Sequence, residues 1–117
     1  MKKLLIMILI ALPFSLSAQS KGKKNTKASF EVSGTCEMCQ NRVQKAALSV
    51  KGIKTANWDI PSHIITVIYD SNKVSLETLQ NTIALVGHDT PLVKAEDANY
   101  DKLPMCCLYE RMPIVTN

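Results

Sequence analysis

The chain has 117 residues, a formal net charge of +4 at pH 7 and 21% charged residues, a length that fits one small domain. Six of its basic residues precede Ala28, and from Ala28 onward eight basic residues stand against ten acidic ones. A domain that binds nucleic acid needs a basic face, so this balance excludes nucleic acid as a partner.

The first 18 residues have the pattern of a secretory signal peptide. Lys2 and Lys3 form a basic start, residues 4–12 are an unbroken apolar run, and small residues lead to Ala18. The run is shorter than the ~20 residues with which a helix crosses a bilayer. We therefore expect cleavage after Ala18, secretion across the inner membrane into the periplasm, and no stable membrane insertion of the mature chain. An uncleaved membrane anchor is the alternative.

The mature chain is expected to begin with a flexible arm, because residues 19–27 hold four lysines among small polar residues. Phe30 and Val32 then alternate with polar neighbours, which predicts a strand that ends at Gly34. A helix follows, since apolar residues recur at helical spacing up to Lys51-Gly52. The apolar positions of this helix are Val43, Ala46, Ala47 and Val50.

Two alternating segments, 55–60 and 64–69, predict a hairpin across Pro61-Ser62, with Trp58 in the core and His63 at the end far from Gly34. A second helix is expected between the N-cap Ser75 and Gly87, with apolar positions Leu76, Leu79, Ile83 and Val86. Residues 91–95 supply a short final strand. The order β-α-β-β-α-β over residues 28–95 predicts a ferredoxin-like α+β sandwich. Residues 96–117 form a C-terminal extension lying over the domain.

Cys36 and Cys39 stand where the first strand's loop enters the first helix. Unpaired N–H groups and the partial positive charge of a helix N-terminus favour thiolates there. Two converging thiolates are soft ligands that suit Cu(I), Zn(II) or Hg(II). A local disulfide and a thioredoxin-like dithiol are the alternative interpretations of this spacing.

A second pair, Cys106 and Cys107, is adjacent in sequence within the extension. A disulfide between neighbouring residues is strained, so the pair is not expected to bond to itself. Two interpretations remain open: one or both thiols complete the metal site with Cys36 and Cys39, or they form disulfides between the extension and the loop.

The run Val32-Ser33-Gly34-Thr35-Cys36-Glu37-Met38-Cys39, with the helix and the β-β-α-β order that follow, resembles the heavy-metal-associated domain family over about Lys27 to Ala95. That family includes copper chaperones, metal-binding domains of metal-pumping ATPases and the periplasmic mercury-binding protein of mercury resistance. The resemblance implies the same fold, and metal sequestration and hand-over with Cys36 and Cys39 as ligands. The Cys106-Cys107 pair lies outside the usual family domain.

Two positions are interpreted through that resemblance. The family loop typically reads Gly-Met-Thr-Cys, whereas Gly34 stands at the methionine position, and Met38 is a candidate to replace the missing packing. Family members often carry an aromatic residue or a lysine where this chain has His88, on the loop facing the metal. His88 is therefore a candidate third ligand or proton-linked tuner of the thiolates, against the alternative of a histidine that simply ends a helix.

The expected function is binding without turnover. An exported protein of this kind would pass its metal to a metal-transporting membrane protein or another metal-binding domain by ligand exchange. Cu(I) is favoured, and Hg(II) or Zn(II) are alternatives. Convergence of all four cysteines would favour Zn(II). A thiol–disulfide redox protein and a disulfide-stabilised interaction module are the competing functions, although thioredoxin-type motifs belong to a different strand order and a longer chain.

Overall fold

The computed structural model describes residues 22–111, so the expected signal peptide and residues 112–117 lie outside the described part. Among these residues no helix is long and apolar enough to cross a membrane. The elements are β1 (Thr26–Glu31), α1 (Glu37–Ser49), β2 (Ile53–Trp58), β3 (Ile64–Tyr69), α2 (Leu76–Leu85), the short helix α3 (Asp97–Asp101) and the 3-10 turn η1 (Met105–Cys107).

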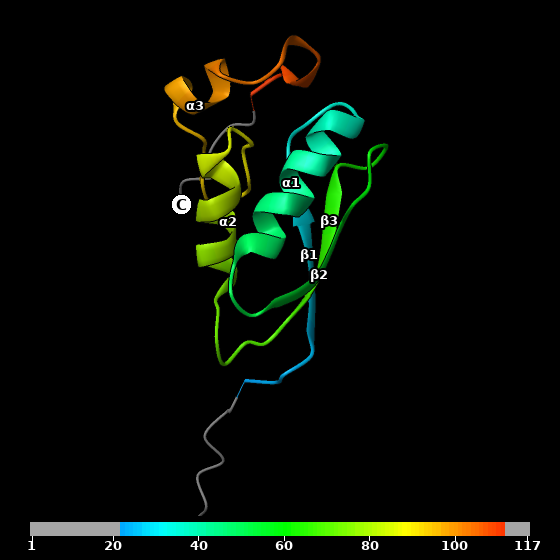
Figure 1. Ribbon diagram of the computed structural model, residues 1–117, viewed down its shortest axis with the longest axis vertical. Helices are drawn as coiled ribbons and strands as arrows, with labels where there is room; N and C mark the ends of the chain where they lie inside the picture. Colours follow the sequence, from blue (N-terminus) through cyan, green and yellow to red (C-terminus); the bar gives the residue numbers. More distant parts are fainter. Residues whose placement is uncertain (1–21, 112–117) are drawn as a thin grey trace, which may run out of the picture.

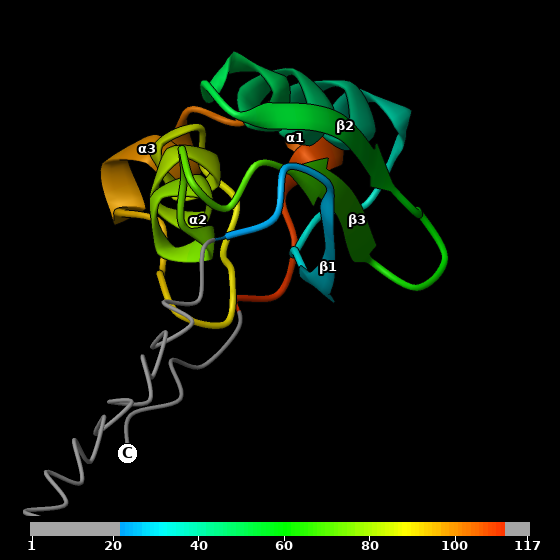
Figure 2. The ribbon, with the colours of Figure 1, turned by 90° about the horizontal axis from the view of Figure 1, so that it is seen from below.

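The three strands form an antiparallel sheet in the order β1-β3-β2. Helices α1 and α2 lie side by side and run in opposite directions, and α1 also packs on β2 (Figures 1 and 2). This is the expected ferredoxin-like α+β fold. The elements α3 and η1 lie at the end of the molecule where α1 begins (Figure 1).

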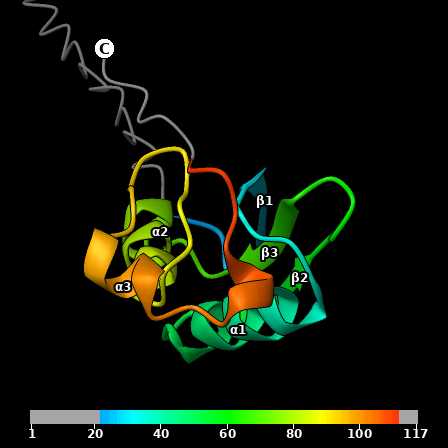
Figure 3. The same cartoon turned by 90° about the horizontal axis from the view of Figure 1, so that it is seen from above.

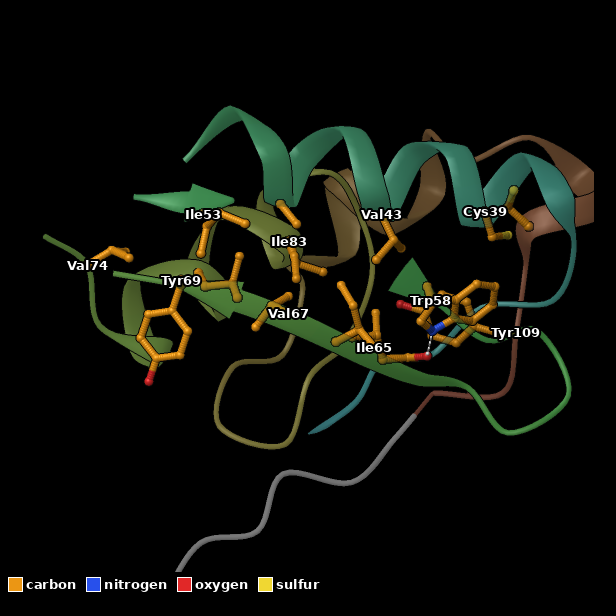
Figure 4. Close-up of a cluster of buried hydrophobic side chains, with 14 of the residues drawn as sticks. Cys39, Val43, Ile53, Trp58, Ile65, Val67, Tyr69, Val74, Ile83 and Tyr109 are labelled. Carbon is orange, nitrogen blue, oxygen red and sulfur yellow. Dashed lines mark hydrogen bonds between the residues drawn. The ribbon is translucent and has the colours of Figure 1, made fainter. Parts of the chain in front are cut away.

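The core lies between the sheet and the two helices (Figure 4). The helical positions that the apolar spacing singled out are buried at Val43, Ala46, Ala47, Leu79 and Ile83, and Trp58 is fully buried. The C-terminal extension also enters this core with Leu103, Cys107 and Tyr109. It is therefore packed into the domain rather than merely laid across it.

The boundaries of α2 follow the sequence signals. The Ser75 hydroxyl accepts a hydrogen bond from the Thr78 N–H at 3.2 Å, as an N-cap should. Gly87 follows the helix with a φ of 101°, a conformation that side chains disfavour. A Cβ at Gly87 would lie 2.8 Å from the Asn99 carbonyl oxygen and 2.9 Å from Leu103, so this glycine also lets the extension approach the helix end.

The expected final strand over residues 91–95 is wrong: the described part of the sheet has three strands. The chain after α2 makes one strand-like contact, in which the Ser33 N–H donates to the Asp89 carbonyl at 3.0 Å. It then turns, because the Thr90 N–H bonds to the Val93 carbonyl at 2.9 Å and Pro91 has no N–H for a ladder. The chain consequently stays near the end of β1 instead of running along it.

Two smaller expectations also need correction. The first strand begins at Thr26, inside the expected arm, because Lys23 donates its N–H to the Ser71 hydroxyl at 2.8 Å and the Thr26 hydroxyl bonds the Lys23 carbonyl at 3.1 Å. His63 lies beside the loop that follows β1, since the Val32 N–H donates to its carbonyl at 2.8 Å. The antiparallel pairing of β1 with β3 puts the hairpin turn and the cysteine loop at the same end of the sheet.

Candidate metal site

The loop between β1 and α1 presents two of the four thiols. Cys36 is the N-cap of α1 with an extended backbone, φ −142°, and Cys39 lies fully buried in the first turn. Their Sγ atoms are 3.8 Å apart. No disulfide joins any of the four cysteines, all of which are free thiols.

The indole of Trp58 supports this loop from below (Figure 4). Its Nε1–H donates to the carbonyls of Val32 and His63, both at 3.0 Å. A Cβ at Gly34 would lie 2.9 Å from the indole ring and 3.1 Å from the Cβ of Cys39. Trp58 therefore fills the space beneath the loop, the packing role for which Met38 was the sequence-based candidate. The indole leaves no room for a side chain at position 34, which explains the glycine there.

A polar anchor formed by Asp89, Tyr109 and Arg111 holds the extension beside the loop. The Arg111 guanidinium bonds the buried Asp89 carboxylate through Nε at 2.8 Å and a second nitrogen at 3.0 Å. The Tyr109 hydroxyl accepts from the Asp89 N–H at 2.8 Å and donates to the Gly87 carbonyl at 2.6 Å. Arg111 also lies 4.4 Å from the ring centre of Tyr100, whose hydroxyl bonds the Tyr109 carbonyl.

This anchoring places the turn η1 over the start of α1 (Figure 3). The Thr35 hydroxyl donates to the Cys106 carbonyl, which joins the loop directly to the turn. The Sγ atoms of Cys36 and Cys107 are 3.9 Å apart. Among residues 22–111, one group of three metal-ligand side chains has its ligand atoms all within 4.8 Å of one another: Cys36, Cys106 and Cys107.

The thiols of Cys36, Cys106 and Cys107 differ in their protonation. The backbone N–H of Cys39 stabilises the Cys36 thiolate and lowers the pKa of Cys36 to about 6, against a smaller opposing effect of burial. Burial raises the pKa of Cys107, and its contact with Cys39 adds to the rise. The pKa of Cys106 is raised chiefly by its hydrogen bond with Cys36. At neutral pH the site therefore combines the Cys36 thiolate with protonated Cys106 and Cys107.

His88 is fully buried but lies outside the group of thiols within 4.8 Å. Its Nδ1 is 2.7 Å from the Ser33 carbonyl and its ring stacks on Tyr109 at 5.8 Å between centres. Burial lowers the pKa of His88, so the ring is neutral at pH 7. The structure thus brings Cys36, Cys39, Cys106 and Cys107 together, whereas His88 connects the loop to the extension.

The residues that form the polar anchor carried no sequence signal that pointed to this site. Asp89 and Arg111 are 22 positions apart in segments without helical or strand periodicity. The nearest available hint was compositional, because an arginine and two tyrosines flank the Cys106-Cys107 pair in an otherwise irregular segment.

The donor set suits a soft monovalent or divalent ion. Cysteine sulfurs select Cu(I) or Zn(II) over hard cations, and three or four of them lie within a few ångström of one another. Among the described residues the thiols of this group have no carboxylate or imidazole within the same 4.8 Å spacing. A thiolate-rich site fits Cu(I), whose coordination favours few sulfur ligands.

Comparison with known proteins agrees with this chemistry. The model of the heavy-metal-associated domain matches residues 29–89. The copper chaperone CopZ of Staphylococcus haemolyticus is 33% identical over 55 residues, 47% of this chain and 81% of the chaperone. A copper-exporting P-type ATPase of Bacillus subtilis is 27% identical over 62% of this chain, which spans 9% of that enzyme.

A solved structure is similar over much of the same region. It is the N-terminal domain of a potential copper-translocating P-type ATPase from Bacillus subtilis in the Cu(I)-loaded state. It is 27% identical, with a TM-score of 0.55, over 62% of this chain and 92% of that domain.

Proposed function

Because this chain belongs to the heavy-metal-associated domain family, we propose that it binds Cu(I) through Cys36, Cys39 and Cys107 and passes the ion to thiols of another protein. The observation that carries the proposal is the position of the Cys36 sulfur, 3.8 Å from that of Cys39 and 3.9 Å from that of Cys107. The copper chaperone and the Cu(I)-loaded domain among its relatives support the choice of metal.

The sulfur separations fit a shared metal ion. For metal–sulfur bonds of about 2.3 Å, sulfurs lie about 3.8 Å apart in a tetrahedral site and about 4.0 Å apart in a trigonal one. Two sulfurs on opposite sides of the ion would lie about 4.6 Å apart at the same bond length. The observed 3.8 and 3.9 Å therefore favour three or four sulfur ligands over a two-coordinate pair.

Protonation of the thiols sets the order in which they bind. Cys36, whose pKa is lowered to about 6, binds Cu(I) before the buried Cys107 does. Cys107 loses its proton only when the ion replaces it, because burial raises its pKa. Cu(I) binding consequently releases protons, and the bound ion neutralises part of the negative charge that the thiolates would otherwise place in a half-buried site.

Hand-over needs a ligand that the partner can displace. Cys106 is exposed, whereas Cys39 and Cys107 are buried, so an incoming thiol reaches the site from the Cys106 side. The partner is a metal-transporting membrane protein or another metal-binding domain. Ligand exchange of this kind is binding without turnover, because the ion leaves in the oxidation state in which it arrived.

The compartment is part of the same proposal. The basic start, the apolar run of residues 4–12 and the small residues before Ala18 support export to the periplasm. Mass spectrometry of the protein recovered from the periplasm should give a chain that begins at Gln19. An intact chain beginning at Met1 would contradict export by cleavage.

The test of the function is a titration of the reduced mature chain with Cu(I) in competition with a chelator, alongside Zn(II) and Hg(II). One Cu(I) per chain should bind. Cys36→Ser and Cys39→Ser should each weaken Cu(I) binding by at least about a hundredfold, the equivalent of ~2.8 kcal/mol, with the fold unchanged. Wild-type affinity in both variants would show that the ion binds elsewhere. Tighter binding of Zn(II) under competition would identify Zn(II), not Cu(I), as the metal of the site.

One observation favours a second function, a thiol–disulfide redox protein. The pKa of Cys36 is lowered to about 6, and a neighbouring thiol lies 3.8 Å away, as in redox-active dithiols. An assay of disulfide reduction distinguishes the two functions. Turnover of a disulfide substrate well above the rate with a free thiol supports the redox protein, whereas turnover at the free-thiol rate supports copper binding as the function.

A further inference from the structure

A fifth sulfur lies at the outer edge of the thiol group. The Met38 Sδ is 3.8 Å from the Cys106 Sγ, although 68 positions separate the two residues. Met38 is 48% exposed on the first turn of α1, and Cys106 is exposed on η1. Both side chains of the pair are therefore accessible from solvent.

The position of Met38 in α1 explains why its sulfur contacts the extension and not Cys36. Residues two apart on a helix point in different directions, so Met38 does not share a helix face with Cys36. Cys39, one position further, is fully buried, while Met38 is half exposed. The Met38 thioether comes next to a thiol only because η1 carries Cys106 across the start of α1.

The sulfurs thus form a graded sequence from the surface inward. Met38 and Cys106 are exposed, Cys36 is half-buried, and Cys39 and Cys107 are buried. Cys106 belongs to the group within 4.8 Å that contains Cys36 and Cys107, so it adjoins both the outer and the inner sulfurs. The Met38–Cys106 and Cys36–Cys107 sulfurs are 3.8 and 3.9 Å apart, and those of Cys106 and Cys36 lie within 4.8 Å, so small side-chain movements pass an ion between them.

We propose that Met38 and Cys106 form an outer Cu(I)-loading site, from which the ion moves to Cys36 and then to the buried thiols. This inference rests on the proposed function and concerns the path by which the same site fills. A thioether is a neutral, soft ligand that binds Cu(I) without losing a proton and releases it readily to thiolates. A surface leucine would serve any packing role of Met38 equally well but would offer no ligand.

The transfer is a sequence of ligand exchanges at constant oxidation state. Cu(I) leaves the donor's ligand and binds the Met38 sulfur and the Cys106 sulfur, whose proton passes to solvent. The Cys36 thiolate then bonds to the ion as the Met38 bond breaks. Cys107 bonds to the ion as the bond to Cys106 breaks, and the Cys107 proton passes to the Cys106 thiolate. Cys39 completes the inner site, any remaining thiol proton passes to solvent, and Met38 is left free to bind the next ion.

The test separates the path from the destination. Reduced mature chain is mixed rapidly with a Cu(I)–chelator complex, and the loss of the complex's absorbance gives the loading rate. Met38→Leu should load about tenfold more slowly, a barrier higher by about 1.4 kcal/mol, while its equilibrium Cu(I) affinity stays unchanged. Met105→Leu is the matched control, because Met105 is 88% exposed on η1, the turn that carries Cys106. This variant should load at the wild-type rate.

A second readout does not depend on rate. In the Cys36→Ser variant, which lacks the thiolate that draws the ion inward, the ¹³C-labelled methyl signal of Met38 should shift when Cu(I) is added, while that of Met105 should not. Wild-type loading by Met38→Leu, an equal slowing by Met105→Leu, or an unshifted Met38 signal would each overturn the loading site. In any of these cases, undiminished Cu(I) affinity would leave the proposed function standing, whereas absence of Cu(I) binding to the wild type would overturn both.

Discussion

The two segments that carry the cysteines are held in place by different forces. Under the β1–α1 loop lies the fully buried indole of Trp58, with the apolar core beneath it. The C-terminal extension depends more on the polar anchor, in which Arg111 bonds the buried carboxylate of Asp89. Close apolar packing spreads the support of the loop over many contacts, whereas the support of the extension rests on one buried ion pair that is costly to break.

This difference assigns different tasks to the two segments. The loop keeps Cys36 and Cys39 at a fixed spacing in the same rigid unit as the helix. The extension adds Cys107 and Cys106 through contacts that depend on a few polar groups. A domain with the loop alone would be a two-thiol site, and the anchored extension converts it into a site with up to four.

The largest expected effect falls on the loop's support. Trp58→Ala removes a fully buried side chain and leaves the carbonyls of Val32 and His63 without their shared donor. The free energy of unfolding should fall by about 3–5 kcal/mol, measured by chemical denaturation. A fall below about 1 kcal/mol, the scale of a surface change, would show that the loop does not depend on this indole.

A smaller loss is expected from the polar anchor. Arg111→Met leaves the buried Asp89 carboxylate without its guanidinium and should lower the free energy of unfolding by about 1–3 kcal/mol. Arg111→Lys, which keeps the charge but not the two-pronged contact, should recover part of the loss.

The same variant sharpens the comparison at the metal site. If the anchor acts by positioning Cys107, Arg111→Met should weaken Cu(I) binding, and adding it to Cys107→Ala should weaken binding no further. Additive losses of Cu(I) affinity would mean that the anchor and Cys107 act independently and that the anchor does not position Cys107.

The smallest expected effect is a difference in thiol pKa between the cysteine of the loop and those of the extension. The ordinary pKa of a cysteine is 9.0, and that of Cys36 is lowered to about 6 in the fold. Between these values the folded chain binds fewer protons than the unfolded chain, so this contribution to stability grows with pH and disappears as pH falls to about 6. Alkylation followed by peptide mass spectrometry should give a midpoint near pH 6 for Cys36 and higher midpoints for Cys106 and Cys107. A shared midpoint near pH 9 would contradict the assignment.

Much of the domain could be predicted from the sequence because its helices and hairpin repeat apolar residues with a regular period. Val43 and Leu79 mark helical faces, and Ser75 and Gly87 mark the ends of α2 by local chemistry alone. Periodicity did not show that the chain turns at Pro91 rather than forming a fourth strand. A pattern of apolar residues over 91–95 is too short to distinguish a strand from a turn closed by Thr90 and Val93.

The site was predictable in part for the same reason. Cys36 and Cys39 are neighbours in sequence, so their proximity follows from a single turn of helix. The approach of Cys107 depends on the pairing of Asp89 with Arg111, which no local pattern encodes. Likewise, the fit of Trp58 against Gly34 joins residues from two elements and becomes visible only when both are folded.

Completion of the metal site by the C-terminal extension can be tested directly. The most direct measurement compares Cu(I) affinity, by chelator competition, for the mature wild-type chain, Cys107→Ala and Cys106→Ala. Alanine avoids an unpaired hydroxyl at the buried position, and Cys106 is the adjacent, exposed control. We predict that Cys107→Ala weakens binding by at least about tenfold, the equivalent of ~1.4 kcal/mol, and that Cys106→Ala weakens it less. Equal affinity in the wild type and Cys107→Ala would contradict the claim and reduce the site to Cys36 and Cys39.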